Sequence, residues 1–223
     1  MAVRAAVRAK VEKERVAPRL MPEWEETEVG TVDELLSGRF VEERRFEDLH
    51  LTGQRVGALA VGQSYFDRVS FARCEVGSVK WSDVRLVGCD LSNARFRHFE
   101  ATRVEFVRCK LVGMNAVGCR WQDVLLEECD ASLIQLSDAR LERWEARGTQ
   151  LREAAINSAE LKGVRWREVN LREADLAETS LQDVDLRGCE LEGITLKVED
   201  LRGAIVSAPQ AMELARFLGL VVR

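Results

Sequence analysis

A leucine recurs at every fifth residue of the segment LREADLAETSLQDVDLRGCELEG, residues 171–193. In an α-helix, a step of five residues turns each side chain by about 140°, so these leucines would spread around the whole helix. In a flat strand, side chains alternate with period two, so successive leucines would point to opposite sides. The spacing therefore predicts a chain that bends once in each repeat and points every fifth side chain toward one axis, which is a solenoid.

The five-residue period covers about three quarters of the chain. Every fifth residue from Val41 to Leu201 is apolar, and the residue two positions earlier is mostly small or medium-sized. Where that earlier residue is bulky, alanine often follows, as in Trp144 with Ala146, so the pattern indicates a core of constant volume. The other three positions are mostly charged or polar, as on a solvated surface. The predicted core of the most regular segment is Leu171, Leu176, Leu181, Leu186 and Leu191.

Short motifs in these repeats match a known pattern. ADLAE (174–178), SNARF (92–96) and READL (172–176) match or approach A(D/N)Lxx, and the sequence resembles the pentapeptide repeat proteins. The resemblance implies an all-β solenoid, a right-handed quadrilateral β-helix with four pentapeptides in each square coil. Residues 41–205 would then form about eight coils, a rod of about 40 Å at roughly 4.8 Å per coil. The large central residues Trp81, Trp121 and Trp166 predict local bulging of the coils.

Residues 1–40 are expected to form a basic N-terminal arm and a short capping helix. Thr31 and Glu34 are spaced as in a capping box, which predicts a helix that covers the first coil. For the arm, a loose helix, a disordered tail and a stretch upstream of a start at Met21 remain open, with a disordered tail favoured.

Residues 206–223 are expected to form a C-terminal helix and tail. Ser207 and Gln210 predict the start of this helix and Gly219 its end. The segment is more apolar than a single lid requires. It resembles the segment through which gyrase-directed pentapeptide repeat proteins form two-fold dimers. The resemblance implies a homodimer, with an interface at Met212, Phe217, Leu218, Leu220, Val221 and Val222.

No catalytic residue, metal or cofactor is expected. His50 and His98 fall at outward positions that are far apart in the repeat, so they form no acid–base pair. No glycine-rich phosphate loop or metal-binding motif occurs. The six cysteines all fall in the second inward series, where free cysteine packs as a small apolar residue; they are Cys74, Cys89, Cys109, Cys119, Cys129 and Cys189.

The resemblance also implies a function. Family members with assigned roles, such as the Qnr-type quinolone resistance proteins and the self-immunity proteins of organisms that produce gyrase poisons, bind DNA gyrase or topoisomerase IV as DNA mimics. A non-catalytic protein that inhibits such an enzyme, or protects it from topoisomerase poisons, is therefore expected. The unbroken register leaves no room for the loops of Qnr-type proteins, which weighs against drug protection.

The charge of the chain supports DNA mimicry in one segment only. Duplex DNA carries one negative charge per ~1.7 Å, so a 40 Å rod would need roughly 23. Residues 46–223 hold 28 acidic and 24 basic residues, but residues 168–200 hold ten acidic and three basic ones. This acidic band is the predicted partner-binding surface, through Glu168, Glu173, Asp175, Glu178, Asp183, Asp185, Glu190 and Glu192.

A scaffold or adaptor that binds an unrelated protein through its sides is the alternative. Apolar residues at outward positions are unusual for a solvated face, and six of them fall in the middle coils: Val87, Val107, Val112, Val117, Leu125 and Leu133. The net charge of −5 argues against direct binding of nucleic acid. No apolar run is long enough to span a membrane and no signal peptide is apparent, so a cytoplasmic protein is expected.

Overall fold

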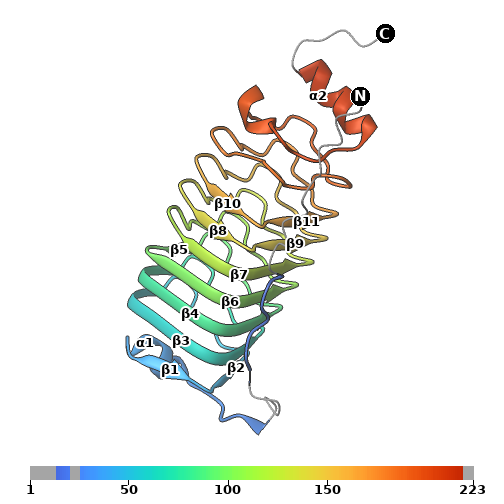
Figure 1. Ribbon diagram of the computed structural model, residues 1–223. Helices are drawn as coiled ribbons and strands as arrows, with labels where there is room; N and C mark the ends of the chain where they lie inside the picture. Colours follow the sequence, from blue (N-terminus) through green and yellow to red (C-terminus); the bar gives the residue numbers. More distant parts are fainter. Residues whose placement is uncertain (1–13, 21–25, 218–223) are drawn as a thin grey trace.

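The computed structural model describes residues 14–20 and 26–217, and most of them form a stack of coils along an elongated rod (Figure 1). A short helix lies at one end and a longer helix at the other. In chain order the elements are α1 (Val32–Leu36), β1 (Phe40–Glu42), β2 (Arg45–Glu47), β3 (Arg55–Asp67), β4 (Glu75–Val87), β5 (Arg95–Phe96), β6 (Phe99–Val107), β7 (Arg120–Glu127), β8 (Arg140–Glu142), β9 (Glu145–Arg147), β10 (Glu160–Lys162), β11 (Arg165–Arg167), the 3-10 helix η2 (Val198–Leu201) and α2 (Ala208–Phe217).

Each strand from β1 to β9 pairs in parallel with the segment twenty residues later. Phe40 pairs with Ala60, and Arg120 pairs with Arg140. Twenty residues are four pentapeptides, so the predicted quadrilateral β-helix is confirmed. Regular strands cover about six turns rather than the eight coils predicted. Beyond Arg167, isolated bridges continue the same register as far as Ile205.

The corners of the coil explain how the chain turns every five residues. The last residue of nearly every pentapeptide has a positive φ, for example 56° at Asp83 and 62° at Glu178. This left-handed conformation costs an L-residue about 1 kcal/mol or more, and glycine adopts it freely, as at Gly193 with a φ of 71°. The ladder of backbone hydrogen bonds and the buried core offset this cost at every corner.

The core is a single column of apolar side chains along the axis of the rod. The five leucines predicted as core, Leu171 to Leu191, are at most 4% exposed. Large and small residues alternate between coils: Trp81 and Trp121 each lie beside Ala101. The strands remain paired at both tryptophans, because the small alanine between them leaves room for the two indole rings.

Three core tryptophans form an edge-to-face series, and Phe99 contacts both Trp81 and Trp121 in the same way. The ring centroids of Trp121 and Trp144 are 6.1 Å apart, with an interplanar angle of 75°. Those of Trp144 and Trp166 are 5.4 Å apart, with an angle of 84°. The indole N–H groups have no hydrogen-bond acceptor among the described residues. Edge-to-face contact is the arrangement that aromatic quadrupoles favour, and it places the positive edge of one ring against the face of the next.

A few hydroxyl side chains also point into the column, and each is satisfied by a backbone carbonyl. Thr149 donates to the carbonyls of Leu126 and Arg147 at 3.1 and 3.0 Å, and Thr179 donates to that of Ile156 at 2.7 Å. Because these hydrogen bonds are made, burial of the hydroxyls does not carry the cost of an unpaired polar group.

Helices lie over both ends of the stack. Thr31 and Glu34 form a capping box at the start of α1, whose Leu35 is buried. At the other end, the Gln210 side chain of α2 donates to the carbonyls of Leu186 and Cys189 at 2.7 and 2.9 Å, and Leu214 is buried. In the part of the chain that is described, no helix is long and apolar enough to cross a membrane.

Candidate protein-binding surfaces

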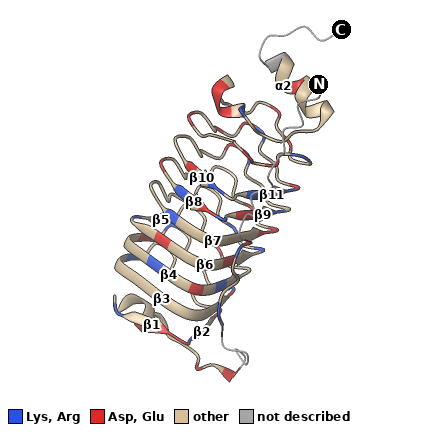
Figure 2. Cartoon of the chain, viewed as in Figure 1, with Lys and Arg blue, Asp and Glu red and all other residues tan. Residues whose placement is uncertain are grey.

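The acidic band lies in the coils near the C-terminal end of the rod (Figure 2). Glu173 and Asp183 are both corner residues and lie ten residues apart, which is half a turn, so they occupy opposite corners. Asp175 and Asp185 begin the sides that follow these two corners. The predicted band is therefore not one face, and a partner on one side of the rod meets only part of it.

The three basic residues inside the band all form ion pairs with its carboxylates. Hydrogen bonds from Lys197 and Arg187 hold the pKa of Glu178 and of Asp185, respectively, below their ordinary values. The pairs are Glu178 with Lys197 at 2.8 Å, Asp185 with Arg187 at 2.7 Å, and Glu190 and Glu192 with Arg172 at 3.1 and 3.4 Å. Within residues 14–20 and 26–217, the other four predicted members form no ion pair: Glu168, Glu173, Asp175 and Asp183.

Elsewhere along the rod, opposite charges follow one another from coil to coil. Glu100 lies between Lys80 and Arg120, at 3.6 and 3.3 Å. Arg140 pairs with Glu160 at 3.3 Å in the same column. These pairs neutralise much of the charge on the sides, so the unbalanced negative charge is concentrated in the band.

The six outward apolar residues do not share one exposed face. Val107 and Leu125 are buried, at 4% and 3% exposure, whereas Val117 and Leu133 are each 44% exposed. Val87, Val107 and Leu125 share one side of the twenty-residue turn, whereas Val112 and Val117 lie on two other sides and Leu133 lies at a corner. The six residues therefore form no single exposed apolar face in the middle coils.

Part of the N-terminal arm lies along the rod (Figure 1). Residues 14–20, which are called the arm below, run lengthwise over the coils. The amide of Val16 donates to Asp123 at 2.9 Å, and the amide of Arg19 donates to Asp83 at 2.8 Å. The favoured expectation of a disordered tail was wrong for this segment, and residues 1–13 and 21–25 lie outside the described residues.

The surface beneath the arm is lined with carboxylates that are nearly inaccessible. We call it the carboxylate strip, and it comprises Asp83, Glu105, Asp123 and Glu145, which are 2–7% exposed. Arg15 of the arm lies 2.9 Å from Glu105 and 3.7 Å from Glu145. These two glutamates flank Leu125 by one coil on either side, so Arg15 lies across Leu125 and accounts for its burial.

Sequence reasoning missed the carboxylate strip. Its carboxylates are scattered through the chain, and they come together only because the coil has twenty residues. The sequence signal is an aspartate followed twenty residues later by an arginine, which occurs at Asp83 with Arg103 and at Asp123 with Arg143, and also at Asp48 with Arg68 away from the arm.

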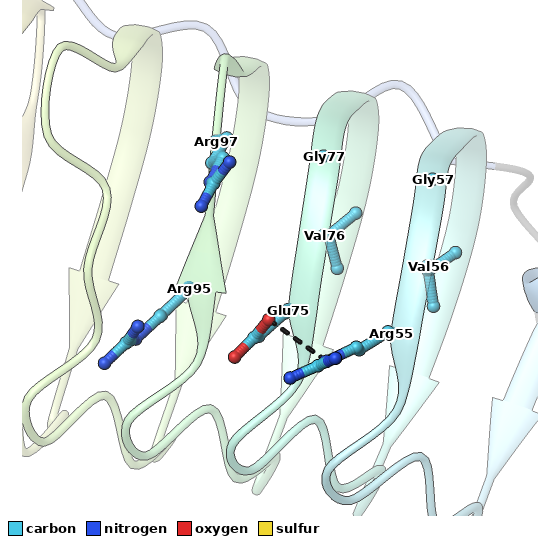
Figure 3. Close-up of a pocket in the computed structure, with 8 residues that line it drawn as sticks. All are labelled: Arg55, Val56, Gly57, Glu75, Val76, Gly77, Arg95 and Arg97. Carbon is cyan, nitrogen blue, oxygen red and sulfur yellow. Dashed lines mark ion pairs between the residues drawn. The ribbon is translucent and has the colours of Figure 1, made fainter.

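A basic groove lies near the other end of the rod (Figure 3). It has a volume of about 330 Å³, and Gly57 and Gly77 leave it open because they carry no side chain. Arg55 pairs with Glu75 across the groove at 3.3 Å. Two further guanidinium groups line it from the next coil, those of Arg95 and Arg97. The groove has the charge to attract an anion, and it contains no nucleophile or acid–base pair.

The cysteines and histidines are not arranged for catalysis. All six cysteines are free and buried. Burial raises the pKa of the Cys109 and Cys119 thiols well above the ordinary value, so neither thiol is a ready nucleophile. His50 and His98 are both exposed and lie on different sides of the rod. Among the described residues, no group of three His, Cys, Asp or Glu side chains is placed to hold a metal ion.

Only one predicted dimer residue has a described side chain. Met212, on α2, is 48% exposed, whereas Leu214 of the same helix packs on the last coil. The other predicted members are the Phe217 side chain and residues Leu218, Leu220, Val221 and Val222, and they lie outside the described part.

Family models match the repeats directly. The pentapeptide repeat region model matches residues 79–156, and the model for pentapeptide repeats, in eight copies, matches residues 154–193. Together they cover more than half of the chain. The chain belongs to the pentapeptide repeat family.

Solved structures are also similar to this chain. HetL, involved in heterocyst differentiation regulation in the cyanobacterium Nostoc sp. strain PCC 7120, is 22% identical, with 76% of this chain and 90% of HetL covered and a TM-score of 0.36. A trypsin-treated form of QnrB1, a plasmid-mediated fluoroquinolone resistance protein, is 20% identical over 83% of this chain and 92% of its own, with a TM-score of 0.35. The comparison with curated proteins gives no match.

Proposed function

We propose that this pentapeptide repeat protein is a non-catalytic binding protein whose partner is a type II DNA topoisomerase, DNA gyrase or topoisomerase IV. The acidic band carries the proposal. Its ten acidic and three basic residues leave an excess of seven negative charges within about two coils. Because DNA would carry about five charges over the same ~8 Å, the band is dense enough to attract a basic DNA-binding surface.

The ion pairs inside the band reduce its contact surface but not its net charge. All three basic residues are already paired, so the excess negative charge falls on the remaining carboxylates. At the two opposite corners, Glu173 and Asp183 are the unpaired residues best placed to meet a partner. A contact of this kind speeds association and weakens as salt increases.

A DNA supercoiling assay with purified gyrase tests the proposal. We expect the protein to inhibit supercoiling, or to relieve inhibition by a quinolone, at micromolar concentration. A variant in which lysine replaces Asp183, Asp185, Glu190 and Glu192 reverses charge in the band and should lose both the inhibition and the relief. A matched variant, in which lysine replaces Asp90, Asp130, Asp138 and Glu160 outside the band, should retain the activity of the unmodified protein.

The protein is also proposed to form a homodimer through its C-terminus. The exposed Met212 on α2 supports this, because the side of the helix that packs on the rod is already occupied by Leu214. Sedimentation should show a dimer at micromolar concentration, and Met212→Glu should shift it toward monomer. Monomer alone in the unmodified protein would refute the dimer without affecting the topoisomerase proposal.

An adaptor role is the second candidate, and a different observation favours it. The side of the rod already holds an extended peptide, its own arm, through carboxylates that would otherwise lie on the surface. Failure of the supercoiling assay above micromolar concentration, with neither inhibition nor relief, would favour the adaptor.

A further inference from the structure

We propose that the carboxylate strip is a docking surface for an extended, arginine-containing segment of a partner protein, and that the arm fills this surface when no partner is bound. The inference goes beyond topoisomerase binding, because it concerns a different part of the rod and does not depend on the acidic band.

The strip contains two hydrogen-bonding modules of the same design. In each, an arginine one coil further along the rod donates twice to an aspartate, and the same Oδ1 atom also accepts a backbone amide of the arm. Arg103 donates to Asp83 at 2.6 Å through Nε and through Nη2, and Arg143 donates to Asp123 at 2.7 and 2.8 Å. Each arginine thus fixes the carboxylate in the orientation that receives the arm.

The spacing of the modules matches an extended chain. Asp83 and Asp123 are two coils apart, which is about 9.6 Å at the usual spacing of parallel strands. The two amides that they accept, those of Val16 and Arg19, are three residues apart, and three residues of extended or polyproline chain span about 9–10 Å. Pro18 lies between them and favours this extended form.

Within the column of corner residues beneath the arm, the modules occur only where the arm uses them. In the same column of corner residues, Glu43 is followed twenty residues later by Gln63, and Asp183 is followed by Gly203. Neither pair places a guanidinium beside the carboxylate. The strip therefore recognises two amides at one spacing and at one place along the rod.

Arg15 of the arm makes only part of the contacts that the two glutamates of the strip offer to an arginine. Arg15 hydrogen-bonds to Glu105 at 2.9 Å, but its Nε atom lies 3.7 Å from Glu145, beyond hydrogen-bond range. Both Nε and Nη1 of Arg15 are buried and have no hydrogen-bond partner among the described residues. Buried donors without partners are costly, so a segment whose arginine reaches both glutamates has an advantage over the arm.

These contacts define the partner by its chemistry. It is an extended segment with an arginine, a free amide on the next residue and a second free amide three residues further on. The side chains of the two residues that donate these amides do not determine binding, because the aspartates accept hydrogen bonds from backbone N–H groups. The segment needs no secondary structure, as is typical of a linker or a tail.

Peptide binding to the full-length protein tests this surface. The probe is a fluorescent heptapeptide with the sequence of residues 14–20, ERVAPRL, and binding is followed by anisotropy. We expect little binding to the unmodified protein, whose strip is occupied, and binding at least about tenfold stronger to Arg15→Ala, whose arm is weakened. Equal and undetectable binding to both proteins at millimolar peptide would overturn the proposal.

The peptide itself supplies the matched control. Methylation of the amide nitrogen at the position of Val16 removes one N–H donor without touching the protein, and should weaken binding about tenfold or more. Methylation at the position of Ala17, which donates no hydrogen bond to the strip here, should have a smaller effect. If both peptides bound equally well, the proposed register would be wrong.

A second copy of the chain is the competing occupant. Sedimentation of the unmodified protein and of Glu145→Gln separates the two cases, with circular dichroism as the check that the variant is folded. We expect the same oligomeric state for both. Loss of self-association in the variant alone would show that the strip holds the arm of another copy, and would overturn the partner-protein proposal.

Discussion

Asp123 accepts two hydrogen bonds from Arg143, a residue one coil further along the rod, and its side chain is only 3% exposed. The same relationship recurs on the open surface, where Arg68 donates twice to Asp48 at 2.8 and 2.9 Å. There both side chains are more than half exposed. The two pairs share their spacing and corner positions and differ in burial.

The first prediction compares these two pairs. Asp123→Asn should lower the free energy of unfolding by about 3 kcal/mol, because the largely buried Arg143 loses the carboxylate to which it donates twice and keeps only the more exposed Glu142 as a counter-charge. Asp48→Asn should leave the urea midpoint close to that of the unmodified protein, because water solvates the exposed Arg68. Urea unfolding followed by circular dichroism measures both. Equal losses would mean that the covering arm contributes nothing to the buried pair.

The second prediction concerns pH. Burial by itself raises the pKa of Asp123, but hydrogen bonds from Arg143 and from the Val16 amide more than offset this and hold the pKa below its ordinary value. The pKa of Asp83 is lowered in the same way by Arg103 and the Arg19 amide, against the effect of burial.

Because the folded state lowers these two pKa values, their stabilisation is fully present above the ordinary value of about 3.9 and is lost as the pH falls through the folded-state values. The urea midpoint should therefore stay level from neutral pH to about pH 5 and fall below about pH 4. A variant with asparagine at both positions should lose less stability over that acidic range. A steeper fall in the variant would contradict the assignment.

The fold could be predicted from sequence because its rule is local and repeated. Each fifth residue must be apolar, and the sequence meets this from Val41 to Leu201 without a slip. A register shift of one residue would turn charged side chains such as Arg172 into the core, so the coil has only one workable phase. The number of regular turns was less accessible, because it depends on hydrogen-bond geometry beyond Arg167.

The surface was harder to predict than the core. The sequence indicated the net charge of the acidic band and its spread over several faces, but not the ion pairs that Arg172, Arg187 and Lys197 form within it. The docked arm was missed for a physical reason: its amides contact residues 64 and 107 positions away, and a backbone N–H leaves no trace in the sequence. Only Arg15, with its paired glutamates, carried a side-chain signal.

The third prediction addresses the alternation of large and small residues along the core. Ala101 lies between Trp81 and Trp121, so Ala101→Leu has no free volume to enter. It should lower the free energy of unfolding by about 2 kcal/mol and change the tryptophan fluorescence. Ala211→Leu makes the same chemical change on an exposed part of α2 and should change neither. An unchanged urea midpoint for Ala101→Leu would indicate space around the indoles.

The last prediction concerns the six thiols. A colorimetric disulfide reagent reacts with thiolates, and burial both raises the pKa of Cys109 and Cys119 and blocks access to them. No cysteine should react within minutes in the folded protein, and all six should react in concentrated urea. Leu133→Cys places a thiol at an outward corner where leucine is 44% exposed, and should add one fast equivalent. A fast equivalent in the unmodified protein would mean that a coil opens locally, because an inward side chain reaches solvent only when the hydrogen-bond ladder beside it breaks.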